Sequence, residues 1–212
     1  MKVFESIYIL VRYAEVIESL TQVMVDNEYH KRRPLDKKEQ FHYVTLFTHI
    51  LMDVNSFFDE YDNNFERLAE EDYKDRIRTV KRIAKPAVDK IREWKEIRKF
   101  RNEMISHNWR DKENNFIMSK LGDYNTPRSF HDLLYLDSYI VIIKAVILAE
   151  FDSNKDEFAK HIKEIGKDFE APKANPDFEG EIRKLVSQVN ENSLSNGRGY
   201  NFNADLIMGN FD

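Results

Sequence analysis

Three residues in one short stretch have side chains that could act together in a reaction. In KFRNEMISHNWR, which spans residues 99–110, Arg101, Asn102 and His107 stand where apolar residues had been recurring. A guanidinium placed among apolar residues requires an acidic partner, a ligand or another subunit. Histidine exchanges protons near neutral pH. The stretch is therefore a candidate reactive site, and the alternative is the polar end of a helix.

Arg101 occupies an unusual position on its helix. At about 100° per residue, the helix leading into the stretch places Arg101 near the middle of an apolar face, which is formed by Trp94, Ile97, Phe100, Met104 and Ile105. His107 lies about 120° around the axis from Arg101 and roughly 9 Å along it, so the two side chains do not meet within one unbroken helix. They converge only through a helix end after Ser106 or across a symmetric dimer.

A structural explanation of the same residues stays open. Arg101 could form an ion pair with a carboxylate on another helix, such as Glu15 or Asp53. His107 would then be a polar helix terminus close to the C-terminal end of the helix dipole, where a cation is favoured. Under this interpretation the stretch stabilises the fold and has no reactive role.

Metal and cofactor sites find less support. Glu39 and His42 form Glu-x-x-His, and His42, His49 and Asp53 follow one helix face. Di-iron bundles need this motif from two helices, whereas Glu157 and His161 have a different spacing. The chain has no cysteine, which excludes thiolate ligands, thiol nucleophiles and disulfides, and no Gly-rich phosphate loop. We predict no metal and no cofactor, and we interpret these side chains as polar residues on the surfaces of helices.

The elements that must position Arg101 are helices. Apolar residues at helical spacing predict long helices over 2–25, 37–59, 73–106 and 130–152, and shorter ones before Asp72 and over 154–166. Pro86 should kink or divide the third, and the fourth is apolar enough to belong in the middle of the bundle. Residues 108–129 read as a long loop, with a short extended segment at 116–121.

The fold class that follows is all-α, a bundle of long antiparallel helices over residues 1–168. Residues 169–212 contain several Pro, Gly and Asn residues around one amphipathic piece at about 178–191. We therefore expect this part to be a loosely attached C-terminal tail with one short helix.

Charge and hydropathy narrow the class of protein further. The 212-residue chain has a formal net charge of -5, which argues against a protein that coats nucleic acid nonspecifically. Its most apolar segment, 140–149, is well short of the roughly 20 residues that span a bilayer, and the N-terminus lacks the features of a secretion signal. We expect a cytoplasmic protein that does not act at a membrane.

The arrangement of Arg101, Asn102 and His107 resembles the signature of the HEPN superfamily, and RNEMISHNWR looks like the corresponding segment of HEPN proteins from phage-defence and abortive-infection systems. The resemblance covers the motif and a helical core of about 40–150. The commonest spacing has four residues between the Arg and the His, whereas this chain has five.

The resemblance implies a function. Many HEPN proteins are metal-independent ribonucleases and toxins whose homodimers bring two motifs into one cleft. Carried over, Arg101 would hold the scissile phosphate, Asn102 would support it and His107 would transfer protons, while Lys99, Trp109 and Arg110 would bind RNA. Other members are catalytically inactive structural or partner-binding modules. The expected partners are therefore RNA, a second copy, and an antitoxin or a nucleotidyltransferase.

Overall fold

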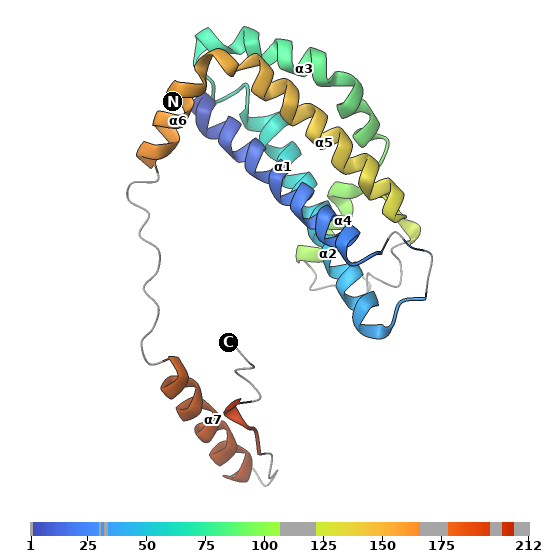
Figure 1. Ribbon diagram of the computed structural model, residues 1–212, viewed down its shortest axis with the longest axis vertical. Coiled ribbons are helices and arrows are strands. Elements are labelled where there is room, and N and C mark those ends of the chain that lie inside the picture. Colours follow the sequence, from blue (N-terminus) through green and yellow to red (C-terminus); the bar gives the residue numbers. More distant parts are fainter. Residues whose placement is uncertain are drawn as a thin grey trace. The chain divides into compact units, whose positions relative to one another are not determined.

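The computed structural model describes residues 2–29, 31, 34–106, 122–165, 178–195 and 201–205 (Figure 1). The chain divides into two compact units, Met1–Lys167 and Asp168–Asp212. The described residues contain helices and no strand. The prediction of an all-α helical bundle is therefore confirmed.

The first unit is built on four long helices and two shorter ones. They are α1 (Lys2–Asp26), α2 (Lys37–Asp59), α3 (Glu71–Arg92), α4 (Ile97–Ser106), α5 (Phe130–Glu150) and α6 (Lys155–Ile165), with a π-helical turn, η1 (Glu60–Asn64), after α2 and a 3-10 turn, η3 (Asp152–Asn154), before α6. α1 packs against α2 and α5, and α5 packs against α3. α5 accordingly lies between α1 and α3 (Figure 1).

Two of the predicted helices begin at capping boxes. The Asp36 side chain accepts a hydrogen bond from the Glu39 backbone, and the Glu39 carboxylate accepts one from the Asp36 backbone. Ser129 and Asp132 make the same reciprocal pair at the start of α5. Because each pair satisfies amide groups that a helix start leaves open, α2 and α5 begin where the sequence pattern predicts.

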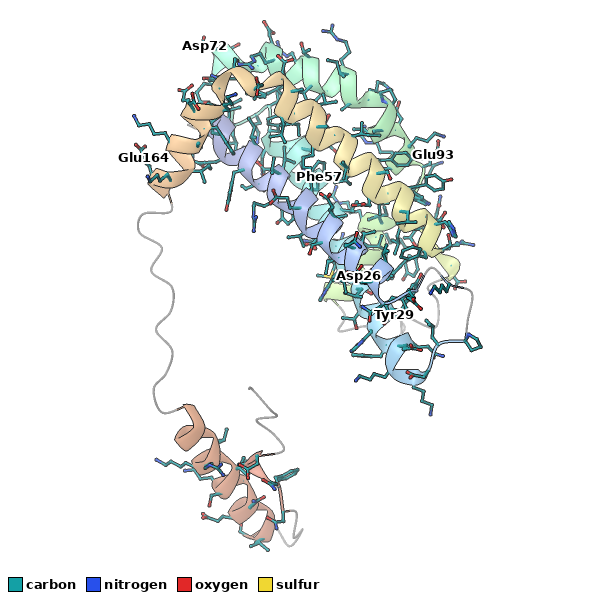
Figure 2. All side chains as sticks on the ribbon, viewed as in Figure 1. Asp26, Tyr29, Phe57, Asp72, Glu93 and Glu164 are labelled. Carbon is teal, nitrogen blue, oxygen red and sulfur yellow. The ribbon has the colours of Figure 1, made fainter. Side chains whose placement is uncertain are left out.

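The core is aromatic and aliphatic. Phe57, labelled near the middle of the bundle in Figure 2, is fully buried, as are Phe4, Phe47, Phe65 and Phe100. The prediction that α5 belongs in the middle of the bundle agrees with its contacts with α1 and α3, but the helix is not covered on every side. α5 buries the face that carries Leu136, Ile140 and Ile143 and exposes large side chains on the other, namely Tyr135, Ile142 and Leu148. Its neighbours α1 and α3 flank the buried face and leave the outer one open.

The predicted third helix is divided, but not at Pro86. α3 continues through Pro86, which is exposed, and ends at Arg92. The break follows Glu93, labelled in Figure 2 at the end of α3. There Asn125 makes three hydrogen bonds with the segment between the two helices. The Glu96 backbone amide donates to the Asn125 carbonyl at 3.1 Å, and the Asn125 backbone amide donates to Glu96 Oε2 at 2.6 Å. Asn125 Nδ2 donates to the Glu93 carbonyl at 3.1 Å. Tertiary contacts with a distant loop therefore replace the helical hydrogen bonds that end here.

The remaining predictions concern short segments. The helix expected before Asp72 is the π-helical turn η1, and helices were correctly predicted over 154–166 and 178–191. Of the predicted loop over 108–129, the structure describes the part from Gly122 onward. The extended segment predicted at 116–121 lies outside the described residues.

The contact between α1 and α5 contains an acidic residue in an unfavourable place. Lys144 Nζ and Glu18 Oε2 lie 2.8 Å apart across the two helices. Asp137, on α5, has a buried Oδ1 without a hydrogen-bond partner. Burial, together with the nearby charge of Glu18 and against the opposing effect of Lys144, raises the pKa of Asp137 from 3.8 to about 6. The ionised carboxylate is thus destabilising in the folded chain.

An Asp137→Asn variant should be more stable than wild type in a pH-dependent way. Between pH 4 and pH 6 the folded chain binds more protons at this position than the unfolded chain, so its free energy of unfolding falls as pH rises. After discounting for solvent screening, we expect the variant to gain about 1–2 kcal/mol at pH 8 and about half of that at pH 5. Urea denaturation at both pH values measures this.

Asp123→Asn, at an exposed position, is the matched control, and it should change the free energy of unfolding little at either pH. A gain for Asp137→Asn that is equal at pH 5 and pH 8 would show that the carboxylate charge is not its cause.

The second unit contains α7 (Phe178–Ser195) and the segment 201–205. Asn190 Nδ2 donates to the Phe202 carbonyl at 3.0 Å, the Phe202 amide donates to Asn190 Oδ1 at 2.8 Å, and Arg183 forms an ion pair with Asp205 at 2.6 Å. The segment after α7 therefore folds back along this helix through the Asn190 amide.

Candidate functional site

α4 carries two of the three residues of the predicted motif, Arg101 and Asn102. This ten-residue helix packs against α2. Ile97 and Phe100 are buried, and the Phe100 ring contacts the Tyr124 ring edge to face, with centroids 5.4 Å apart. The part of the predicted apolar face that Ile97 and Phe100 form is therefore buried, as the helical spacing indicated.

Arg101 is partly buried and has no counterion among the described residues. Its Nη1 donates to Asn102 Oδ1 at 3.2 Å, and its Nε is buried without a hydrogen-bond partner. Among the described residues, Arg101 forms no ion pair with a carboxylate. A buried donor without a partner costs about 1–3 kcal/mol, so a hydrogen-bond acceptor at this position would stabilise the guanidinium.

The ion pairs considered for Arg101 from the sequence are not formed. Glu15 instead pairs with Arg12, 2.7 Å away on the same helix. Asp53 lies on α2, where burial raises its pKa and the neighbouring His49 partly lowers it. Among the described residues, neither of these two carboxylates forms an ion pair with Arg101.

The other predicted RNA-binding or catalytic residues fall into two groups. Asn102 and Lys99 are exposed on α4, and Lys99 pairs with Glu96 at 3.1 Å and lies over the Tyr124 ring, 5.3 Å from its centroid. His107, Trp109 and Arg110 lie outside the described residues. The predicted meeting of Arg101 with His107 therefore stays a prediction.

A hollow beside the first turn of α4 was not foreseen from the sequence. It has a volume of about 240 Å³ and is lined by the end of α2, the π-helical turn η1, the end of α3 and the start of α4. Aromatic, amide, acidic and basic side chains all contribute, among them Phe58, Trp94, Asp59, Arg92 and Arg98. No motif joins these residues, because they come from segments far apart in the sequence.

The π-helical turn at the wall of this hollow is held by a buried carboxylate. Glu60 accepts a hydrogen bond from Ser6 Oγ at 2.5 Å and one from Asn64 Nδ2 at 2.8 Å. Such turns are rare and often occur at functional sites. Glu60 therefore fixes the wall to α1 and leaves the side chains of Asp62 and Asn63 along the hollow.

The residues considered for a metal site are dispersed or engaged elsewhere. Glu39 belongs to the capping box of α2, Glu157 accepts a hydrogen bond from Asn154, and His161 lies 3.7 Å from Glu5. Within the part of the chain that the structure describes, no group of three His, Asp or Glu side chains is arranged to hold a metal ion.

Comparison with known proteins finds no relative. No protein-family model matches the chain, and no curated protein or solved structure shows significant similarity to it. Among the described helices, none combines the length and the apolar character needed to cross a membrane. The assignment of function therefore depends on the chemistry of the residues around α4.

Proposed function

We propose that this chain is a metal-independent endoribonuclease of the HEPN type, in which Arg101 holds the scissile phosphate. The observation that carries the proposal is the state of Arg101, a partly buried guanidinium with a buried, unpartnered Nε and no carboxylate counterion among the described residues. A desolvated cation of this kind is stabilised by a bound anion, and guanidinium groups match the geometry of phosphate oxygens.

In the proposed reaction, RNA supplies the nucleophile and the protein supplies proton transfer and charge stabilisation. The 2′-hydroxyl of RNA would attack the adjacent phosphorus, its bond to the leaving 5′-oxygen would break, and the products would be a 2′,3′-cyclic phosphate and a 5′-hydroxyl. His107 would transfer the proton that the 2′-hydroxyl loses to the leaving 5′-oxygen, and Arg101 would stabilise the charge on the nonbridging oxygens. Asn102, which accepts a hydrogen bond from Arg101, would orient the guanidinium. A homodimer would bring a second copy of the motif into the same cleft.

The charge around α4 supports binding to RNA. Residues 92–112 contain seven basic and four acidic residues, a local balance of +3 in a chain of net charge -5. Lys99, Trp109 and Arg110 are the proposed RNA-binding residues of this stretch, the Trp by stacking on a base. The basic character is thus concentrated where the substrate would bind.

The alternative is a catalytically inactive HEPN-like module that binds a partner protein, such as an antitoxin or a nucleotidyltransferase. The hydrogen bond from Arg101 Nη1 to Asn102 favours it, because part of the guanidinium is already engaged by a neighbouring residue. In that case Arg101 would organise the end of α4 for a protein contact.

The proposed reaction can be tested with a pool of single-stranded RNA of random sequence in EDTA. We expect cleavage that EDTA does not inhibit, products ending in 2′,3′-cyclic phosphate, and no cut where a 2′-deoxynucleotide replaces the nucleotide on the 5′ side of the scissile phosphate. Mass spectrometry of the products identifies the ends.

Two results would contradict the proposal. Cleavage that stops in EDTA and returns with Mg²⁺ would indicate a metal-dependent nuclease. A folded protein that leaves every RNA in the pool intact would favour the inactive module, and its partner would then be sought.

A further inference from the structure

The hollow beside α4 lies within one helical turn of Arg101. Ile97 and Arg98 line it, and Arg101 follows them on the same helix. Ile97 and Arg101 are four residues apart, which is about 6 Å along the axis. A polynucleotide whose phosphate contacts Arg101 could therefore place a neighbouring nucleotide at the hollow.

We propose that this hollow binds the base of a nucleotide next to the scissile phosphate in single-stranded RNA, and that it selects bases with an exocyclic amino group. The inference rests on the proposed ribonuclease function, since it assigns part of the substrate of the same site.

The size of the hollow suits one flat ring system. Its volume of about 240 Å³ is below the roughly 300–1,000 Å³ of pockets that enclose drug-sized ligands. A base can enter, while the sugar and phosphate stay outside. This division matches single-stranded RNA, whose unstacked bases are free to turn into a protein pocket.

The walls of the hollow combine aromatic and apolar surface. Trp94 and Phe58 are both partly exposed along it, and Val54, Ile91 and Ile97 contribute aliphatic side chains. Stacking of a base on an aromatic ring contributes about 1–3 kcal/mol. Trp94 also packs against the hydrophobic core, which restricts its ring and prepares it for stacking.

Of the three basic side chains that line the hollow, only one forms an ion pair among the described residues. Arg92 pairs with Asp62 at 2.8 Å. Lys95 and Arg98 are exposed, and neither forms an ion pair among the described residues. Both lie next to the hollow, so they are placed to contact the phosphates that flank a bound base.

The carboxylate of Asp59 is the group that would select the base. Its Oδ2 accepts a hydrogen bond from Asn55 Nδ2 at 3.0 Å, and Asp59 and Asn55 both line the hollow. The remaining carboxylate oxygen can accept a hydrogen bond from an exocyclic amino group, as Asp and Glu do from cytosine N4. Adenine and cytosine carry such a group, whereas uracil presents only a carbonyl at the same position.

Isothermal titration calorimetry of the full chain tests this without any cleavage step. AMP and CMP should bind at least fivefold more tightly than UMP, and ribose 5-phosphate, which lacks a base, should bind at least tenfold more weakly than AMP. A five-nucleotide adenosine RNA with 2′-O-methyl groups, which cannot be cleaved by 2′-hydroxyl attack, should displace AMP.

Variants locate the binding. Asp59→Asn retains the shape of the side chain and should abolish the preference for AMP over UMP, while Trp94→Leu should weaken AMP binding about tenfold. Arg82→Gln, an exposed change on α3 that does not line the hollow, should leave both affinities unchanged. If Trp94→Leu does not fold, Asp59→Asn alone decides the point.

The outcomes separate this inference from the proposed function. If the chain cleaves RNA in EDTA but does not bind AMP, only the base-pocket proposal is overturned. Equal affinity for AMP and UMP, or AMP that the RNA does not displace, also overturns it. AMP binding that follows the predicted preference supports the pocket, and if the same chain cleaves no RNA, only the ribonuclease proposal fails.

Discussion

An Arg101→Ala variant should cleave RNA roughly 100- to 1,000-fold more slowly than wild type, as when one group that stabilises a developing oxyanion is removed. It should also keep its fold. Among the described residues the side chain makes one hydrogen bond, to its neighbour Asn102, and its buried Nε makes none. Truncation therefore removes an unfavourable buried donor together with the proposed phosphate contact. Single-turnover cleavage in EDTA measures the rate.

Matched variants separate charge, geometry and proton transfer. Arg101→Lys keeps the charge without the planar fork and should lose less activity than Arg101→Ala. His107→Ala should also be strongly impaired, since no other proton-transfer residue is proposed. Arg82→Ala, exposed on α3, should cleave at the wild-type rate. If folded Arg101→Ala is as fast as wild type, Arg101 does not hold the phosphate.

A Phe100→Ala variant should lose about 3–5 kcal/mol of unfolding free energy, the range for large-to-small changes at buried aromatic positions. Phe100 is fully buried on α4 and contacts the Tyr124 ring. Its removal leaves a cavity between α4 and the loop that holds the break before this helix. Because Phe100 precedes Arg101, cleavage should fall as well. Urea denaturation measures the loss of stability.

Phe41→Ala is the control for this prediction. Phe41 is 67% exposed near the start of α2, so its truncation should change stability by less than about 0.5 kcal/mol. Amide hydrogen exchange should show increased exchange in α4 of Phe100→Ala. A loss below 1 kcal/mol with unchanged exchange would indicate that α4 is held by other contacts.

The sequence was sufficient for most of the helices because their signals are local. Apolar residues at helical spacing predicted α1, α2 and α5 within two residues at each end. The capping pairs at Asp36 and Ser129 explain this accuracy, since side chains three residues apart close each helix start without help from the rest of the chain. The same periodicity predicted a buried face on α4, which the structure confirms at Ile97 and Phe100.

Only the tertiary structure decided where α3 ends and which side of α5 is buried. Pro86 does not end its helix, whereas Asn125, 29 residues beyond Glu96, ties the break between α3 and α4. α5 is exposed on one side despite its apolar composition, because its neighbours cover only the other.

The sequence by itself determined that the chain is helical, and it predicted which residues of α4 could do chemistry, which stays a prediction. It did not determine that Arg101 has no carboxylate counterion within the described part of the chain, or that Asp59, Trp94 and Arg98 share one hollow. Periodicity reports the face of a helix on which a residue lies, because that depends on neighbours within a few turns. Which charges and cavities lie against that face depends on segments distant in the sequence, and those segments come together only when the whole bundle packs.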